Sequence, residues 1–109
     1  MRHMVLLTEG AERDLEAIFD YIASTDSPHR ASRLLGQLMA AAGKLSELPG
    51  RGAIPPELLA LGIRDYRQVH FKPYRLIYRV MQRRAIIYVI ADSRRDLPAL
   101  LARRLLQSD

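Results

Sequence analysis

Apolar residues in the first part of the chain recur with the spacing of a helix. A short apolar run at residues 4–8 is typical of a strand, and after it the spacing changes to four, three and four residues. This spacing predicts a helix that ends near Ser24 and buries one face, formed by Ala11, Leu15, Ile18 and Ile22. The acidic residues Glu12, Glu16 and Asp20 are expected outside that face.

A second helix is predicted after Ser27 and Pro28. Serine before a helix accepts a hydrogen bond from the first backbone N–H groups, and proline suits the first turn. The apolar stripe that follows stops before the Pro-Gly pair at residues 49–50 and consists of Leu34, Leu35, Leu38, Met39, Ala42 and Leu45. Because the link between the helices is short, we expect an antiparallel helical hairpin. Residues 55–62 are expected to form one or two helical turns closed by Gly62.

From about residue 64 the period changes to two, which is typical of strands. Strands are predicted at residues 64–71, 74–81 and 85–91, and the short links between them favour an antiparallel meander. In the second strand, one face carries Tyr74, Leu76, Tyr78 and Val80, and the other carries Arg75, Ile77, Arg79 and Met81. We expect the hairpin to cover the first face and Arg75 and Arg79 to project from the more open side.

Asp96, Leu97 and Pro98 are typical of the start of a final helix, whose apolar positions are Leu97, Leu100, Leu101 and Leu105. The order of elements predicts a single domain over residues 1–109, of the α+β class in two layers. Its parts are an N-terminal strand, an antiparallel helical hairpin, a three-stranded antiparallel meander joined to the same sheet, and a short C-terminal helix.

Composition excludes several kinds of chemistry. The chain has no cysteine, which excludes a disulfide, a thiolate zinc site and a thiol nucleophile, and suits a reducing cytoplasm. The longest late apolar run, at residues 85–91, is far shorter than the ~20 residues that span a bilayer. No secretion signal is readable at the start. We therefore expect a soluble protein without a membrane partner, a metal site or a cofactor.

Positive charge is concentrated in the second half of the chain. Residues 1–60 contain 6 basic and 8 acidic residues, a net charge of −2, whereas residues 61–109 contain 11 basic and 4 acidic residues, a net charge of +7. Fifteen of the 17 basic residues are arginine, which favours planar, multi-point contacts with carboxylate or phosphate. An acidic protein segment or a nucleic acid is the expected partner, and a simply solvated basic surface is the alternative.

The segments DYRQ (65–68), PYRLIYRV (73–80) and IIYVIADSRRD (86–96), following two helices, resemble the RelE/ParE superfamily of bacterial type II toxins. The resemblance is to the ParE-like, plasmid-stabilisation branch and runs over residues 5–106. It implies a helical hairpin on a curved antiparallel sheet with the first strand at its margin. It also implies a growth-arresting toxin of the bacterial cytoplasm that a cognate antitoxin, ParD-like or RelB-like, neutralises.

One branch of this superfamily comprises ribosome-dependent mRNA endonucleases, which need cations on the phosphate and groups that transfer protons. The resemblance places Arg75 and Arg95 where that branch has phosphate-stabilising arginines, and Arg67 where it has a basic residue. Val69 replaces a second basic residue, and leucines at 100–101 lie where a proton-transferring tyrosine or histidine is expected.

His70 and Tyr66, which strand alternation places on one face, are the remaining candidates for an acid or base, although we favour a strand histidine and a packing tyrosine without catalytic roles. Because the proton-transfer half is unmatched, the favoured interpretation is a toxin that inhibits DNA gyrase, the action of the other branch, through a protein surface and without catalysis. The alternative is an mRNA interferase acting on ribosome-bound mRNA with Arg67, Arg75, Arg95 and His70. A degenerate, non-toxic binding partner is the third interpretation.

The expected surface for the target or the antitoxin comprises Arg67, Arg75, Arg79, Arg94, Arg95 and Asp96. We expect the antitoxin to lay an amphipathic helix or an extended acidic segment over the helical hairpin and these arginines. The segment around residue 95 also has a structural interpretation, in which Asp96 caps the final helix and Arg94 or Arg95 pairs with Asp92 or Asp65.

Overall fold

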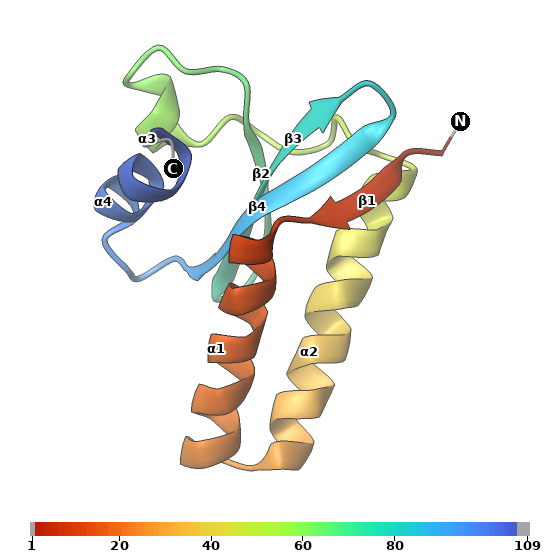
Figure 1. The fold of residues 1–109 in the computed structure, drawn as a ribbon, viewed down its shortest axis with the longest axis vertical. Helices are drawn as coiled ribbons and strands as arrows, with labels where there is room; N and C mark the ends of the chain where they lie inside the picture. The colour runs from red at the N-terminus through yellow and green to blue at the C-terminus, as the bar shows by residue number, and fades with distance from the viewer. Residues whose placement is uncertain (1, 107–109) are drawn as a thin grey trace.

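A four-stranded sheet carries helices on both of its faces (Figure 1) in the computed structural model, which describes residues 2–106. The elements in chain order are β1 (Met4–Leu7), α1 (Glu9–Thr25), α2 (Pro28–Gly43), the 3₁₀ turn η1 (Lys44–Ser46), α3 (Pro56–Leu59), β2 (Arg67–Phe71), β3 (Tyr74–Met81), β4 (Arg84–Asp92), α4 (Leu97–Leu101) and the wider helical turn η2 (Ala102–Leu106). The strand order is β1-β4-β3-β2, with β1 parallel to β4 and the other pairs antiparallel. The predicted α+β fold class, the antiparallel meander and the position of the first strand at the edge of the sheet are confirmed.

Each long helix begins at a side-chain cap. The hydroxyl oxygen of Thr8 accepts a hydrogen bond from the backbone N–H of Ala11 at 3.1 Å, and Ser27 accepts one from Arg30 at 3.1 Å. Pro28 stands in the first turn of α2, as predicted. No helix within residues 2–106 is long and apolar enough to cross a bilayer.

The hairpin of α1 and α2 packs on one face of the sheet and forms the first core. Tyr74, Leu76 and Tyr78 of β3 point into this core, which confirms the predicted face of that strand. Tyr78 and Leu76 are fully buried, whereas Val80 at the end of β3 is 36% exposed. The core thus covers most of the strand and leaves its last residues, near the β3–β4 turn, in contact with solvent.

The opposite face of the sheet is covered as well, because α3 and α4 pack on it around a second core. This core comprises Leu58, Tyr66, Ile77, Val89, Ala91, Leu97, Leu100 and Leu101. The expectation that Arg75 projects from an open side is therefore wrong, since its side chain is only 7% exposed. Arg79, four residues further along β3, is partly exposed. Its guanidinium lies 5.9 Å from the centre of the Tyr66 ring. Both short helices were predicted, but the two-layer prediction did not place them on this face of the sheet.

The edge of β4 beyond its pairing with β1 is closed by an ion pair between α1 and η2. The Arg104 guanidinium donates two hydrogen bonds to the Asp14 carboxylate, at 2.9 and 3.1 Å, and a third to the Tyr88 carbonyl at 2.9 Å. Asp14 in turn accepts the backbone N–H of Ile90 at 2.9 Å. A side chain at Gly10 would meet the guanidinium, since a Cβ there would lie 2.5 Å from its Nη2. The pair therefore ties the end of the chain to both the hairpin and the sheet.

Replacing Arg104 by methionine is expected to lower the free energy of unfolding by about 2 kcal/mol. The change removes the guanidinium that bonds to the mostly buried Asp14 carboxylate and to the Tyr88 carbonyl. The matched control is Arg103→Met, since Arg103 is exposed; this change is expected to have little effect. Urea denaturation of both variants measures the difference. Equal losses for the two variants would contradict a specific role for the Asp14–Arg104 pair.

Candidate functional site

Arg75 is neutralised inside the protein. Its Nη2 donates to Oε2 of Glu57, in the first turn of α3, at 2.9 Å, and the side chains are 7% and 22% exposed. A buried guanidinium requires such a partner, because an unpaired charge in an apolar core is costly. Arg75 is therefore unavailable as an exposed phosphate ligand in this structure.

Arg67 lies on the other face of the sheet and holds a loop. Its Nη1 donates to the carbonyls of Gly52 at 2.7 Å and Gly50 at 3.3 Å. The hydroxyl of Tyr78 donates to the Pro49 carbonyl at 2.6 Å and accepts the Gly52 N–H at 3.1 Å. Burial raises the pKa of the Tyr78 hydroxyl, which keeps this donor protonated. Arg67 thus has a structural role at this loop.

The segment after β4 matches its structural interpretation. Arg94 donates through Nε to the Asp92 carboxylate at 2.9 Å, and the Asp96 carboxylate accepts the Ala99 N–H at 3.3 Å at the start of α4. The hydrogen bonds from Arg94 lower the pKa of Asp92 to about 2. Arg95 is exposed and makes no ion pair within the described part of the chain.

The four residues of the alternative catalytic set do not form one open site. Arg67 pairs with Tyr78 across the strands and lies on the hairpin side, whereas His70 pairs with Arg75 and lies on the opposite side. His70 is exposed and has no side-chain hydrogen bond within residues 2–106, while Arg95 lies in the loop beyond β4. In the same range, no three histidine, cysteine or acidic side chains gather closely enough to hold a metal ion.

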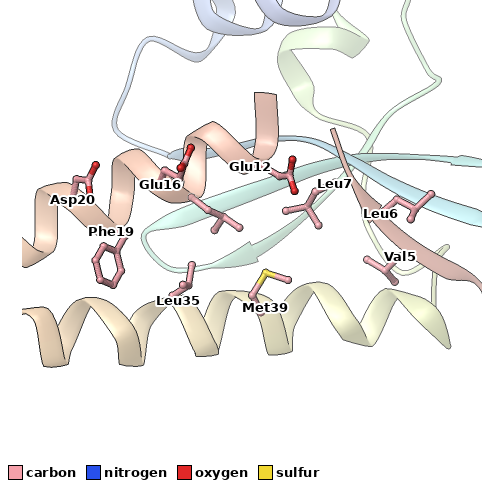
Figure 2. Close-up of a pocket in the computed structure, with 10 residues that line it drawn as sticks. Val5, Leu6, Leu7, Glu12, Glu16, Phe19, Asp20, Leu35 and Met39 are labelled. Atoms are coloured by element: carbon pink, nitrogen blue, oxygen red, sulfur yellow. The ribbon is translucent and has the colours of Figure 1, made fainter. Parts of the chain in front are cut away.

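A groove of about 950 Å³ lies between β1, α1 and α2, as Figure 2 shows. Its apolar lining is Val5, Leu6, Leu7, Leu15, Phe19, Leu35 and Met39, and its acidic lining is Glu12, Glu16 and Asp20. Phe19 from α1 and Leu35 and Met39 from α2 lie toward one another between the helices. Sequence analysis placed several of these residues in a helical core stripe and did not identify the groove. Only the three-dimensional structure shows that the sheet does not cover the whole apolar stripe and leaves part of it lining a groove.

The groove continues into an open strand edge. The backbone N–H of Met4 donates to the Arg83 carbonyl just before β4 at 2.8 Å, and that of Thr8 donates to the Ile87 carbonyl of β4 at 3.0 Å. In a parallel ladder alternate residues bond to the partner strand, and the residues next to them direct their N–H and C=O groups away from it. Val5 and Leu7 therefore offer backbone donors and acceptors on the outer edge of β1, beside the apolar lining. An extended segment can pair with this edge while its side chains enter the groove.

Fold and groove together define a small α+β domain with an apolar groove beside an open edge strand. Residues 5–97 match the family described as the ParE toxin of the type II toxin-antitoxin system parDE, and the chain belongs to this family. It is accordingly a toxin of a type II toxin–antitoxin system. The predicted RelE/ParE resemblance is confirmed.

Two solved structures have the same fold. The chromosomal ParDE toxin–antitoxin system from P. aeruginosa matches with a TM-score of 0.71 and 20% identity, over 84% of this chain and 96% of that chain. The toxin–antitoxin complex RelBE2 from Mycobacterium tuberculosis matches with a TM-score of 0.63 and 23% identity, over 84% and 99% of the two chains. A search of curated proteins gave no match.

Replacing Asp92 by asparagine is expected to lower the free energy of unfolding by about 1 kcal/mol at pH 6, a modest value because Arg94 is largely exposed to water. The folded pKa of Asp92, about 2, lies below its ordinary value of 3.8, so the stabilisation is present above pH 4 and lost as the pH falls toward 2. Denaturation of both proteins between pH 6 and pH 2 measures this. A difference that stays constant across the range would contradict the assignment.

Proposed function

We propose that this toxin inhibits DNA gyrase through its surface, without cleaving RNA, and that its antitoxin docks in the groove. The observation that carries the non-catalytic part is the buried Arg75–Glu57 pair. An RNA-cleaving site needs an accessible cation beside groups that move protons. Here the arginine in the phosphate-stabilising position of the resemblance is already neutralised by a carboxylate of the same chain.

The leucines in the position of a proton-transferring residue support the same proposal. Leu100 and Leu101 are 4% and 1% exposed and belong to the second core. A tyrosine or histidine in either place would have to bury its polar atom among apolar side chains. Leu100 and Leu101 thus serve packing. The imidazole on the same face of the sheet as Arg75 is that of His70.

The lining of the groove indicates which kind of antitoxin segment would bind there. Its lining favours large apolar side chains, the edge of β1 favours a segment that can pair through its backbone, and the carboxylates of Glu12, Glu16 and Asp20 favour basic residues at the rim. Of the two expected antitoxin segments, an amphipathic helix suits this groove better than an extended acidic segment does. An acidic segment suits the cationic second half of the chain instead, where attraction between charges weakens as salt rises.

The turn between β3 and β4 supports the contact with the target. Arg83 and Arg84 are exposed there, and the neighbouring Met81 and Val80 are 42% and 36% exposed. Exposed arginine next to exposed apolar side chains is typical of protein interfaces. Sequence analysis did not include Arg83 and Arg84 among the site residues, because it assigned them to a connecting turn. Because the Met4 N–H donates to the Arg83 carbonyl, this turn adjoins the first residue of β1, and the groove is therefore tested at Met39 of α2 rather than at β1.

Purified toxin is expected to inhibit negative supercoiling by gyrase and to leave ribosome-bound mRNA intact. Charge reversal at Arg83 and Arg84 together is expected to weaken inhibition at least tenfold, because the arginines would no longer attract an acidic patch on the target. Plasmid supercoiling and primer extension on translated mRNA measure the two activities. Codon-edge cleavage with unimpaired supercoiling would reject the proposal and support the mRNA interferase alternative.

Replacing Met39 by glutamate is expected to weaken binding of the antitoxin encoded beside this toxin at least tenfold, because it places a charge against apolar groups in a groove that already has an acidic rim. Met81→Glu is the matched control, since both methionines are 42% exposed but Met81 lies at the β3–β4 turn. Calorimetric titration of the antitoxin into each variant gives the affinities. Equal weakening by both changes would remove the groove from the interface.

A further inference from the structure

The Arg75–Glu57 pair is satisfied by a single hydrogen bond. A guanidinium and a carboxylate can form two parallel bonds, but here only Nη2 of Arg75 bonds to Oε2 of Glu57. Within residues 2–106, the Nε of Arg75 and the Oε1 of Glu57 are buried and have no hydrogen-bond partner. A buried polar atom without a partner is unfavourable, so this pair is weaker than a pair joined by two parallel hydrogen bonds.

The surroundings of the pair leave Glu57 as the anion that neutralises the guanidinium. The cross-strand neighbours of Arg75 are His70 and Ala91, neither of which carries a negative charge, and the second core adds apolar side chains. Glu57 belongs to a four-residue helix that is fixed in the core by Leu58, with exposed Leu59 on its other side. At 22% exposure, the Glu57 side chain also connects the guanidinium with solvent.

We infer that Arg75 forms the base of an oxyanion site that the chain fills with its own Glu57 carboxylate. Removing the Glu57 side chain beyond Cβ leaves a hollow next to a buried cation, open on the side where the carboxylate met solvent. An inorganic phosphate or a similar oxyanion fits this hollow by charge and by its hydrogen-bond acceptors, which can bond to both Nη2 and the unpartnered Nε. Glu57 therefore keeps Arg75 closed to phosphate in the native chain. This inference does not depend on gyrase being the target.

The test is Glu57→Ala with inorganic phosphate as the probe, compared with sodium chloride at equal ionic strength. The variant is expected to be less stable than the native chain in chloride, because Arg75 becomes an unpaired buried charge. Phosphate is expected to raise its Tm by roughly 5 °C in a saturable manner, as expected for a ligand that binds only the folded state. The native chain should show no saturable rise.

Two controls separate this site from general effects of phosphate. Glu47→Ala removes the carboxylate of the Arg2–Glu47 pair, in which both side chains are largely exposed, and should show no saturable phosphate effect. The double variant Glu57→Ala, Arg75→Met removes the cation and should fold in chloride and ignore phosphate. If the single variant is unfolded in chloride, the inference requires it to fold in phosphate. Equal phosphate effects on the single and double variants, or a single variant unfolded in both salts, would overturn the inference.

Discussion

The arrangement depends on one constraint, that the arginine in the middle of β3 must have a negative partner. Arg75 lies on the face of β3 that α3 and α4 cover, so its guanidinium cannot reach bulk water freely. Glu57 supplies the charge, which fixes α3 against the sheet, and Leu58 of the same helix joins the second core. Closure of this face makes the groove and the β3–β4 turn the surfaces proposed here for partner contacts.

The groove itself results from the shortness of β1. Four residues of β1 pair with β4, and the chain then turns into α1 at the Thr8 cap, so the outer edge of β1 stays open beside the hairpin. The remaining edge of β4 is closed by Asp14 and Arg104 instead of a strand. The two surfaces differ in charge, with carboxylates along the groove and arginines at the β3–β4 turn. A partner that binds one is therefore poorly suited to the other.

Most of the fold could be predicted because its signals are local. The spacing of Leu15 and Ile18, the Ser27 cap and the alternation along β3 each depend on a few consecutive residues. The second core and the partner of Arg75 could not be predicted, because Glu57 is 18 residues away in the chain and its short helix has no periodic pattern. The groove could not be predicted either, because the sequence pattern of an apolar stripe is the same whether a sheet covers its side chains or leaves them open.

The closure of Arg75 by Glu57 can be tested by following the Nε–H resonances of Arg75 and Arg95 by NMR while inorganic phosphate is added to the native protein. Arg75 is buried against Glu57, whereas Arg95 is exposed. If Glu57 keeps Arg75 closed, the Arg75 resonance persists with slow solvent exchange and does not move, while the Arg95 resonance shifts weakly without saturation. A saturable shift of the Arg75 resonance would show that the guanidinium is open to phosphate, and would contradict the non-catalytic interpretation.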